Sequence, residues 1–393
     1  MLKYWIWLAE RSSVSDEQKV ALLEHFLTPE EIYSADRFDM VEGLTEKGLE
    51  NLRDRDLTEA TAILARCRKG EISLLTYGDR TYPQRLREIP DPPMVLYYKG
   101  TLPDFDRLPV IGVVGTRRAS GYGLQTAALL GGQIAACGGL VVSGMAEGID
   151  AKATGGALSA GKSAVGVLGC GVDRVYPASN RPLYENMYRY GCLISEFSPG
   201  TPPQKWNFPK RNRIISGLSC GILVVEAPER SGALITARLA LEQQRDVFVV
   251  PGNLGVESCM GSNALLREGA LMVASGWDVV SEYQHLFPNV IERREFAPKP
   301  EEVPETPVFQ QKPREIPADP VPKQKIECTL NALSQDMTPV QRAIAEYLRE
   351  GERLIDDLIL ETGMEPGELL GELTMMEICG LIQTLPGRRV ALL

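Results

Sequence analysis

A short segment in the middle of the chain combines cations with aromatic rings. Residues 204–214 (QKWNFPKRNRI) contain no acidic residue, and Trp206 and Phe208 lie between the basic ones. Cations neutralise phosphates, and aromatic faces stack unpaired bases at about 1–3 kcal/mol per base. The alternative, a solvated basic loop, would not favour two aromatic residues beside a proline. The composition therefore predicts a loop that contacts single-stranded nucleic acid through its four cations, Lys205, Lys210, Arg211 and Arg213.

Three glycine-rich turns follow predicted strands and open predicted helices. The first contains Gly115-Thr116 with Arg117 and Arg118, the second begins with Ser143-Gly144, and the third contains Ser231-Gly232. Backbone amides at such helix starts bind anions, so we expect a phosphate site at these turns. Two alternatives stay open, namely a tight turn with solvated arginines and a serine that only caps its helix.

The same turns argue against a dinucleotide cofactor and against an acidic catalytic residue. The first turn does not have the GxGxxG spacing, and no acidic residue follows where a ribose would need one. Asp150, at the end of the second turn, is well placed as a helix N-cap. No cofactor is expected.

Residues 156–163 (GALSAGKS) match the Walker A expression. A phosphate-binding loop follows a strand and opens a helix, whereas here a predicted helix precedes the motif and a strand follows it. We interpret Gly161 as the end of a helix and exclude an ATPase.

The sequence offers no clear set of catalytic residues. The two histidines, His25 and His285, lie outside the predicted sheet, which excludes a Ser-His-Asp triad or a histidine-rich metal site there. Glu147 and Glu226 could form a carboxylate pair, but nothing in their spacing supports acid–base chemistry. We predict a protein that binds without turnover, with no catalytic residue and no metal.

Strands and helices alternate through the centre of the chain. Continuous apolar strands separated by helices predict a mostly parallel, doubly wound, Rossmann-like α/β sheet covered on both faces. The expected strands are 110–114, 139–143, 163–168, 192–195, 221–226, 246–250 and 271–274. The expected helices include 124–137, 150–160, 181–190 and 233–243.

The regions on either side of this core have other sequence patterns, which predict separate modules. We expect a small helical module of the SAM or helix-hairpin-helix kind over 1–70, the α/β domain over 71–290, and a proline-rich linker over 291–326. Residues 327–393 show three helical stretches followed by two short strands, a pattern typical of a winged helix.

Charge is unevenly distributed along the chain. The net charge is −10, yet residues 109–280 contain 15 basic and 12 acidic residues, so the acidity belongs to the flanks. No apolar run reaches about 18 residues, the length needed for a membrane helix. The N-terminus lacks a secretory signal pattern, and the eight cysteines form no CxxC pair. We expect a cytoplasmic protein with reduced thiols and no membrane contact.

Several segments together resemble the DprA (Smf) family of DNA-processing proteins. The most specific is 207–218 (NFPKRNRIISGL). The others are Tyr82-Pro83, 91–97 (DPPMVLY), 115–117 (GTR), 143–150 (SGMAEGID), 169–173 (GCGVD), Tyr176-Pro177, Glu226-Ala227, 231–233 (SGA), Pro251-Gly252 and 261–263 (GSN). The resemblance is dense over about residues 71–285.

The resemblance implies a cytosolic single-stranded DNA-binding protein with an extended Rossmann fold and no enzymatic activity. Such proteins act in natural transformation (competence) and DNA recombination, protect incoming single strands, load the RecA recombinase past single-strand-binding protein, and form homodimers through the Rossmann domain. By this match Arg117 and residues 205–213 line the DNA pocket. Phe208 stacks a base, Asn212 makes a polar contact, and the phosphates are held by Lys205, Lys210, Arg211 and Arg213.

Two other functions remain as alternatives. Nucleotide phosphoribohydrolases share this Rossmann variant, but residues 229–236 (ERSGALIT) lack their PGGxGT signature. A transcription regulator would use the winged helix, whose cations are few outside Arg342, Arg388 and Arg389. The winged helix is expected to contact either DNA or protein.

Overall fold

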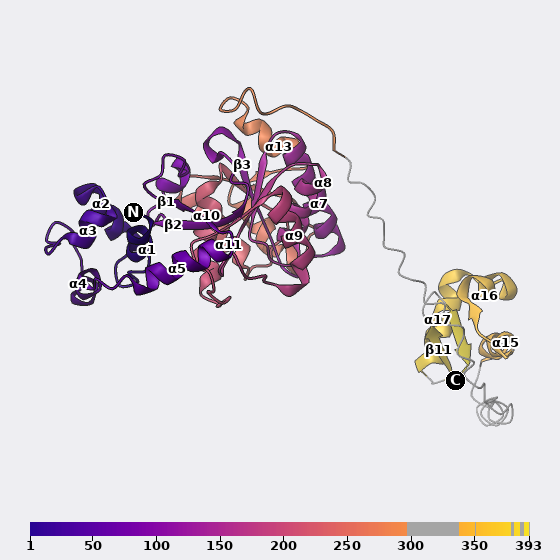
Figure 1. Ribbon diagram of the computed structural model, residues 1–393. Coiled ribbons are helices and arrows are strands. Elements are labelled where there is room, and N and C mark those ends of the chain that lie inside the picture. The colour runs from indigo at the N-terminus through magenta and orange to yellow at the C-terminus, as the bar shows by residue number, and fades with distance from the viewer. Residues whose placement is uncertain (297–337, 350, 379–380, 386–388, 393) are drawn as a thin grey trace. The chain divides into compact units, whose positions relative to one another are not determined.

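The computed structural model describes residues 1–296, 338–349, 351–378, 381–385 and 389–392. The chain divides into two compact units, Met1–Glu301 and Glu302–Leu393 (Figure 1). Most of the linker predicted over 291–326, and Arg388 of the predicted winged helix, lie outside the described residues. No helix in the described ranges is long and apolar enough to cross a membrane.

The first unit is built around a nine-stranded sheet in the order β1-β2-β6-β5-β4-β3-β7-β8-β9. Pairing is parallel from β6 to β9, and β1 and β2 add an antiparallel edge. The strands are β1 Ser73–Thr76, β2 Val95–Gly100, β3 Val110–Val114, β4 Leu140–Ser143, β5 Ala164–Val167, β6 Cys192–Ser195, β7 Gly221–Val224, β8 Asp246–Val249 and β9 Leu271–Met272. The predicted Rossmann-like fold is confirmed; β1 and β2 were not predicted.

Helices cover both faces of this sheet because its strands are apolar on both sides. Ile111 and Val113 of β3 pack with one helical layer, while Val110 and Val114 pack with the other. The first layer consists of α7 Gly121–Ala136, α8 Ile149–Ser159, α9 Arg181–Tyr190 and α13 Gly276–Val280. The second consists of α6 Gln84–Arg87, α10 Asn207–Leu218, α11 Gly232–Glu242 and α12 Met260–Arg267. Short 3₁₀ turns lie at η1 Phe105–Arg107, η2 Ala178–Asn180, η3 Glu257–Cys259 and η4 Ser281–Tyr283.

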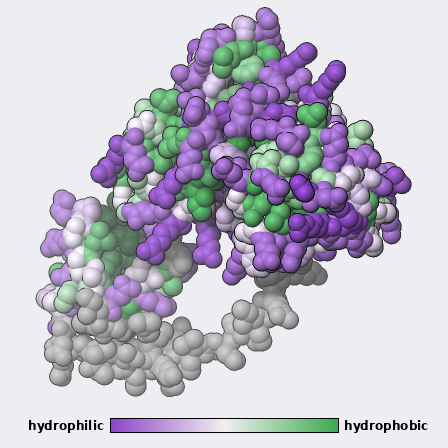
Figure 2. Space-filling view, turned by 90° about the vertical axis from the view of Figure 1, so that its left-hand side faces the viewer, coloured by the Kyte–Doolittle hydropathy of each residue, from purple (hydrophilic) through white to green (hydrophobic). Residues whose placement is uncertain are grey.

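The N-terminal helices share the core of the sheet. Trp7 and Ile63 belong to the same buried apolar cluster as Tyr97 of β2 and Ile111 of β3. On the face that they turn outward, apolar side chains form separate patches among hydrophilic ones (Figure 2). These helices are α1 Leu2–Ala9, α2 Asp16–Phe26, α3 Pro29–Ser34, α4 Glu46–Arg53 and α5 Thr58–Lys69.

In its described residues, the second unit has the predicted arrangement of three helices and a hairpin. Its elements are α15 Pro339–Leu348, β10 Arg353–Leu354, α16 Ile355–Thr362, α17 Pro366–Ile378, β11 Ile382–Leu385 and β12 Arg389–Leu392. The strands pair in the order β10-β12-β11. A separate apolar cluster, which includes Ile344, Leu358 and Leu373, forms the core of this winged helix.

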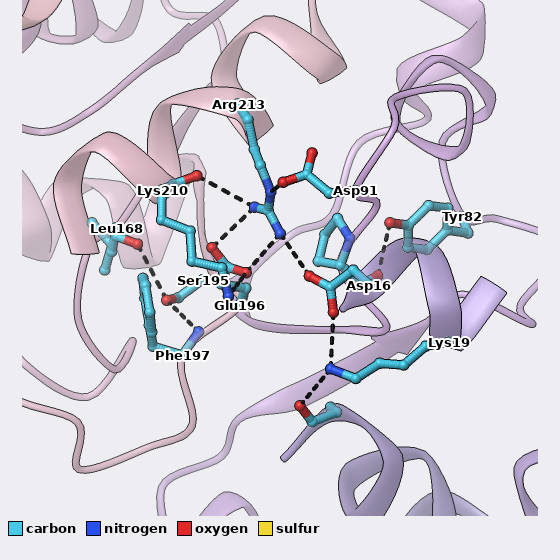
Figure 3. A network of polar contacts seen from close by, with 12 residues as sticks. Asp16, Lys19, Tyr82, Asp91, Leu168, Ser195, Glu196, Phe197, Lys210 and Arg213 are labelled. Carbon is cyan, nitrogen blue, oxygen red and sulfur yellow. Dashed lines mark hydrogen bonds and ion pairs between the residues drawn. The ribbon is translucent and has the colours of Figure 1, made fainter. Parts of the chain in front are cut away.

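A buried arginine on α10 joins the N-terminal helices to the sheet (Figure 3). The Arg213 guanidinium binds both carboxylate oxygens of Glu196, after β6, at 3.0 and 2.9 Å. It also binds Asp91 at 2.8 Å and Asp16 of α2 at 3.2 Å. Only 5% of the Arg213 side chain and 7% of the Glu196 side chain are exposed. Lys19 adds a contact to Asp16 at 2.9 Å.

This network changes the pKa values of its members. Burial alone would raise the pKa of Asp16, but Lys19 and Arg213 outweigh that effect and lower it. Burial would lower the pKa of Arg213, and Glu196, Asp91 and Asp16 raise it instead. A carboxyl with a lowered folded-state pKa stabilises the fold above its unfolded pKa of about 4, and this stabilisation is lost as the pH falls through the lowered value.

We expect Arg213→Met to lower the free energy of unfolding by about 3–5 kcal/mol, because it leaves the carboxylates of Glu196 and Asp16 buried without a guanidinium. Urea unfolding at pH 7 measures this loss. Arg107→Met is the control, since it removes an exposed ion pair to Asp104 and should change the free energy by less than about 1 kcal/mol. Below pH 4 the difference between Arg213→Met and the wild type should shrink. Equal stability of Arg213→Met and Arg107→Met at pH 7 would contradict the role of the network.

Candidate functional site

The cationic segment is helical, so the prediction of a loop was wrong. Helix α10 begins at Asn207 with Trp206 as its N-cap, and Pro209 occupies the first turn, where a proline is tolerated. The helical repeat divides the segment between two faces. Phe208, Arg211 and Asn212 lie on one face, and Asn207, Lys210 and Arg213 lie on another.

The first face borders a cavity of about 600 Å³ at the carboxyl ends of β3 and β7. The chain runs from β3 towards β6 on one side of the sheet and returns to β7 on the other, so this is the topological switch point at which open α/β sheets bind ligands. The turn after β3 lines one wall and the turn after β7 lines another. From these turns and α10, the lining includes Gly115, Thr116, Arg117, Arg118, Lys205, Phe208, Pro209, Arg211, Asn212, Arg230, Ser231 and Gly232.

The cavity is strongly cationic. Its lining contains five basic side chains and one carboxylate, that of Asp150. Four of the cations are exposed, and among the described residues none of the four forms an ion pair. These are Arg117, Arg118, Lys205 and Arg230. Such a wall attracts an anion with several negative charges.

Aromatic rings form part of the wall. The rings of Phe208 and Tyr176 lie 5.4 Å apart between centroids at an interplanar angle of 33°. The Arg117 guanidinium lies over the Phe208 ring, 5.4 Å from its centroid. Below Phe208, Gly169 leaves room for the ring, since a Cβ there would approach within 2.8 Å. The cavity therefore offers flat apolar surfaces next to free cations.

Arg211 is the fifth cation and forms the floor. It is 4% exposed and donates hydrogen bonds to the carbonyl oxygens of Gly144, at 2.7 Å, and Val167, which end β4 and β5. Its Nε donates to the side-chain oxygen of Asn212 at 3.2 Å. Burial lowers the pKa of Arg211, and the nearby Asp150 opposes that effect. Arg211 thus holds the strand ends in place as well as facing the cavity.

Asp150 is not the N-cap that the sequence suggested. Gly148 takes that position with φ +80°, and Asp150 is the second residue of α8. Its carboxylate accepts a hydrogen bond from the Gly144 amide at 3.1 Å. Burial raises the pKa of Asp150, while Arg211 and the Ala146 and Gly144 amides partly offset it. Asp150 therefore counters the charge of Arg211 beneath the cavity.

Backbone amides of the glycine-rich turns are already engaged within the chain, contrary to expectation. The Thr116 amide donates to the Glu226 carbonyl oxygen at 2.7 Å, and the Ser120 amide donates to the Glu226 carboxylate. This carboxylate holds the position in front of α7 that a phosphate was expected to take. Ser143 is buried and donates to the Val113 carbonyl oxygen at 2.7 Å.

At the third turn, Ser231 caps α11 by accepting from the Ala233 amide, as in the capping alternative, although Ser231 and Gly232 also line the cavity. These turns therefore contribute mainly arginine side chains to the cavity, because the backbone amides described above are already hydrogen-bonded.

Lys210 and Arg213 do not line this cavity. Both side chains lie beside Glu196 (Figure 3). Lys210 is half exposed and pairs with Glu196 at 3.2 Å, and Arg213 is enclosed by three carboxylates. The phosphate contact expected for Arg213 is therefore replaced by a structural role.

Sequence reasoning missed Arg118, Arg230 and Tyr176 as site residues. Each is separated in the chain from the cationic segment, and only folding brings it to the cavity. A signal was present for Arg118 and Arg230, because both lie in glycine-rich turns already singled out.

The candidate carboxylate pair is not assembled. Glu226 is 1% exposed and accepts from the Ser120 hydroxyl at 2.9 Å, whereas Glu147 accepts from the Ser179 hydroxyl at 2.5 Å. Neither lines the large cavity. Among the residues that the structure describes, no cluster of His, Cys, Asp and Glu could hold a metal ion.

Comparison with known proteins gives two family matches. The family model of DNA recombination-mediator protein A matches residues 73–284, and that of the DprA winged helix domain matches residues 329–388. Protein Smf of Synechocystis sp. is 32% identical over 392 residues, covering 98% of this chain and 97% of that protein. DNA processing protein DprA of Bacillus subtilis is 41% identical over 220 residues, covering 56% of this chain and 74% of that protein. The X-ray structure of DprA from Streptococcus pneumoniae superposes with a TM-score of 0.64 at 32% identity, covering 72% of this chain and 98% of that one.

Removal of the Asp150 carboxylate should destabilise the floor of the cavity. We expect Asp150→Ala to lower the free energy of unfolding by about 3–5 kcal/mol, because Arg211 then keeps a buried charge without its counter-charge. Chemical denaturation measures this change. Glu147→Ala, which removes an exposed carboxylate three residues away, should stay within about 0.5 kcal/mol of the wild type. Similar losses in both variants would show that Asp150 does not have this role.

Proposed function

This chain belongs to the family of DNA recombination-mediator protein A (DprA, also Smf), and from that premise we propose that it binds single-stranded DNA in the cavity at the carboxyl ends of β3 and β7. Arg117 and Lys205 would hold phosphates, joined by Arg118 and Arg230. Phe208 would stack an unpaired base and Asn212 would make a polar contact. Arg211 would contribute its charge from the floor.

The observation that carries this proposal is the pairing of free cations with a flat aromatic surface in one cavity. Phosphates need cations that no carboxylate already neutralises, and Arg117, Arg118, Lys205 and Arg230 meet that condition within the described residues. Unpaired bases need exposed ring faces, which a duplex cannot use because its bases are already stacked. Tyr176, which is 38% exposed, and the partly buried Phe208 would supply this surface.

We also propose that the site binds and does not catalyse. The one carboxylate among the cavity residues, Asp150, is 6% exposed, accepts a hydrogen bond from the Gly144 amide and counters the charge of Arg211, so it is already engaged within the chain. The phosphoribohydrolase alternative gains no support from the positions of Glu147 and Glu226.

The wider role follows from the family as a further proposal. We infer that the protein protects single strands that enter the cytoplasm during natural transformation and loads RecA onto them past single-strand-binding protein. Self-association through the Rossmann-like unit is supported by β9, an edge strand whose Leu271 and Met272 are exposed. A protein-binding role for the winged helix is supported by α17, which carries Glu368, Glu372 and Glu377 and no basic residue.

Phosphate contacts can be tested by the salt dependence of binding. We expect the double variant Arg117→Ala, Lys205→Ala to bind a labelled oligothymidylate more weakly, and to lower the slope of log K against log salt by about 1.4, since each single-strand phosphate contact contributes about 0.7. Fluorescence anisotropy over a range of salt concentrations measures both quantities.

The matched control is the double variant Arg107→Ala, Lys162→Ala. These cations precede β3 and β5 and so lie at the opposite edge of the sheet from the cavity. This variant should keep the wild-type slope. Equal wild-type affinity for duplex and single strand, or release of adenine from AMP, would contradict the proposed function.

The stacking role of Phe208 can be separated from its packing role. Phe208→Ala should weaken single-strand binding by about 1–3 kcal/mol. Phe208→Leu fills the space above Gly169 without a flat ring, so it should weaken binding similarly while keeping the thermal stability of the wild type. Wild-type affinity in Phe208→Leu would show that the ring only packs.

A further inference from the structure

Trp206 is the most exposed aromatic side chain next to the cavity and has no partner there. Its side chain is 70% exposed, whereas Trp5 and Trp7 are buried. Among the described residues, no aromatic ring stacks on the indole and no cation lies over it. A large exposed aromatic surface of this kind marks a contact site.

Trp206 lies on a ridge between two hollows. On one side, Lys205, Phe208 and Pro209 line the cationic cavity. On the other, Gln204, Asn207 and Lys210 line a second hollow of about 520 Å³ against the N-terminal helices. Trp206 is 70% exposed, lines neither hollow and, as the N-cap of α10, lies between residues that line one or the other.

The charges on the two sides of the ridge differ. Lys205, immediately before Trp206, is exposed and forms no ion pair within the described residues. The second hollow is lined by four carboxylates, those of Glu10, Asp16, Asp91 and Glu196. Lys19 and Lys210 line it too, and together with Arg213 they pair with Asp16, Asp91 and Glu196. A polyanion is therefore attracted up to the ridge, whereas the cations of the second hollow are already neutralised.

We propose that Trp206 forms a second base-stacking subsite, outside the cavity, for the nucleotide of a single strand that leaves the cavity past Lys205. The subsite rests on the proposed function and extends it, because it sets where the bound strand crosses the rim and where the contacts end. An unpaired base stacks on the indole while Lys205 holds the adjoining phosphate. Beyond the ridge, the cations of the second hollow are already paired with carboxylates, so the strand gains no phosphate contact there.

A protein partner could also use an exposed indole, but the surroundings favour a nucleotide. No acidic residue occurs between Gln204 and Ile214. The cation next to Trp206 in the chain, Lys205, lines the cationic cavity. Substitution of Trp206 is also structurally mild, since its side chain makes no capping hydrogen bond to α10.

The test compares the full-length wild type with Trp206→Leu, using oligothymidylates from 4 to 20 nucleotides. With the 20-mer, we expect quenching of the wild-type tryptophan fluorescence that is largely absent in Trp206→Leu, and an affinity about 5- to 150-fold lower in the variant by anisotropy. With the shortest oligomers, which fill only the cavity, the two proteins should bind equally. Trp206→Phe should recover part of the affinity.

Tyr190→Leu is the matched control. Tyr190 is 65% exposed and ends α9, at the opposite edge of the sheet from the cavity, so its loss should leave binding of every oligomer unchanged.

Two results would overturn the proposal without touching the proposed function. One is wild-type affinity and unchanged fluorescence in Trp206→Leu while the Arg117, Lys205 double variant still binds weakly. The other is a change in self-association, seen by sedimentation, with no change in DNA affinity, which would make Trp206 a protein contact. Failure of the wild type to bind any oligomer would overturn both proposals.

Discussion

Two buried guanidinium groups, two residues apart on α10, hold this helix in the one orientation that makes the cavity possible. Arg211 donates to the carbonyl oxygens that end β4 and β5, and Arg213 is enclosed by carboxylates from α2, the turn before β2 and the end of β6. Because successive residues of a helix point about 100° apart, these contacts also set the direction of the residues between and beside them. Phe208 and Asn212 reach the cavity only because Arg211 and Arg213 fix the rotation of α10.

The cost of burying charge explains how the cations of this segment are divided. A buried arginine is tolerated only with hydrogen-bond acceptors or carboxylates around it. Arg211 binds backbone carbonyl oxygens, and Arg213 binds carboxylates. Arginines so engaged have little capacity left for a phosphate. The exposed Arg117, Arg118, Lys205 and Arg230 have lost little hydration and have no carboxylate partner within the described residues, so a polyanion can pair with them. Basic composition thus overstates the number of cations available to a ligand.

The sequence predicted the parts of this protein that depend on local periodicity. Strands β3 and β6 have the predicted bounds, since apolar runs between helices identify buried parallel strands. The loop expected at residues 204–214 is a helix from Asn207 onward, because burial of Ile214, Ile215 and Leu218 decides its conformation. The Glu226 carboxylate in front of α7 could not be foreseen either, because 106 residues separate it from Ser120. Contacts of this length depend on the fold as a whole.

The acidic net charge and the cationic cavity are compatible because electrostatic effects in salt water are short-ranged. At about 0.15 M salt the screening length is about 8 Å, so exposed carboxylates on distant surfaces reduce the potential in the cavity only slightly. Carboxylates close to α10 act differently. Asp16, Asp91 and Glu196 lie on the far side of the ridge at Trp206, and all three are paired with Arg213. Because these carboxylates are paired, they weaken the attraction of the cavity cations for a polyanion only slightly. Helix α10 separates the two regions, because one of its faces borders the cavity with the free cations and another borders the hollow with the paired carboxylates.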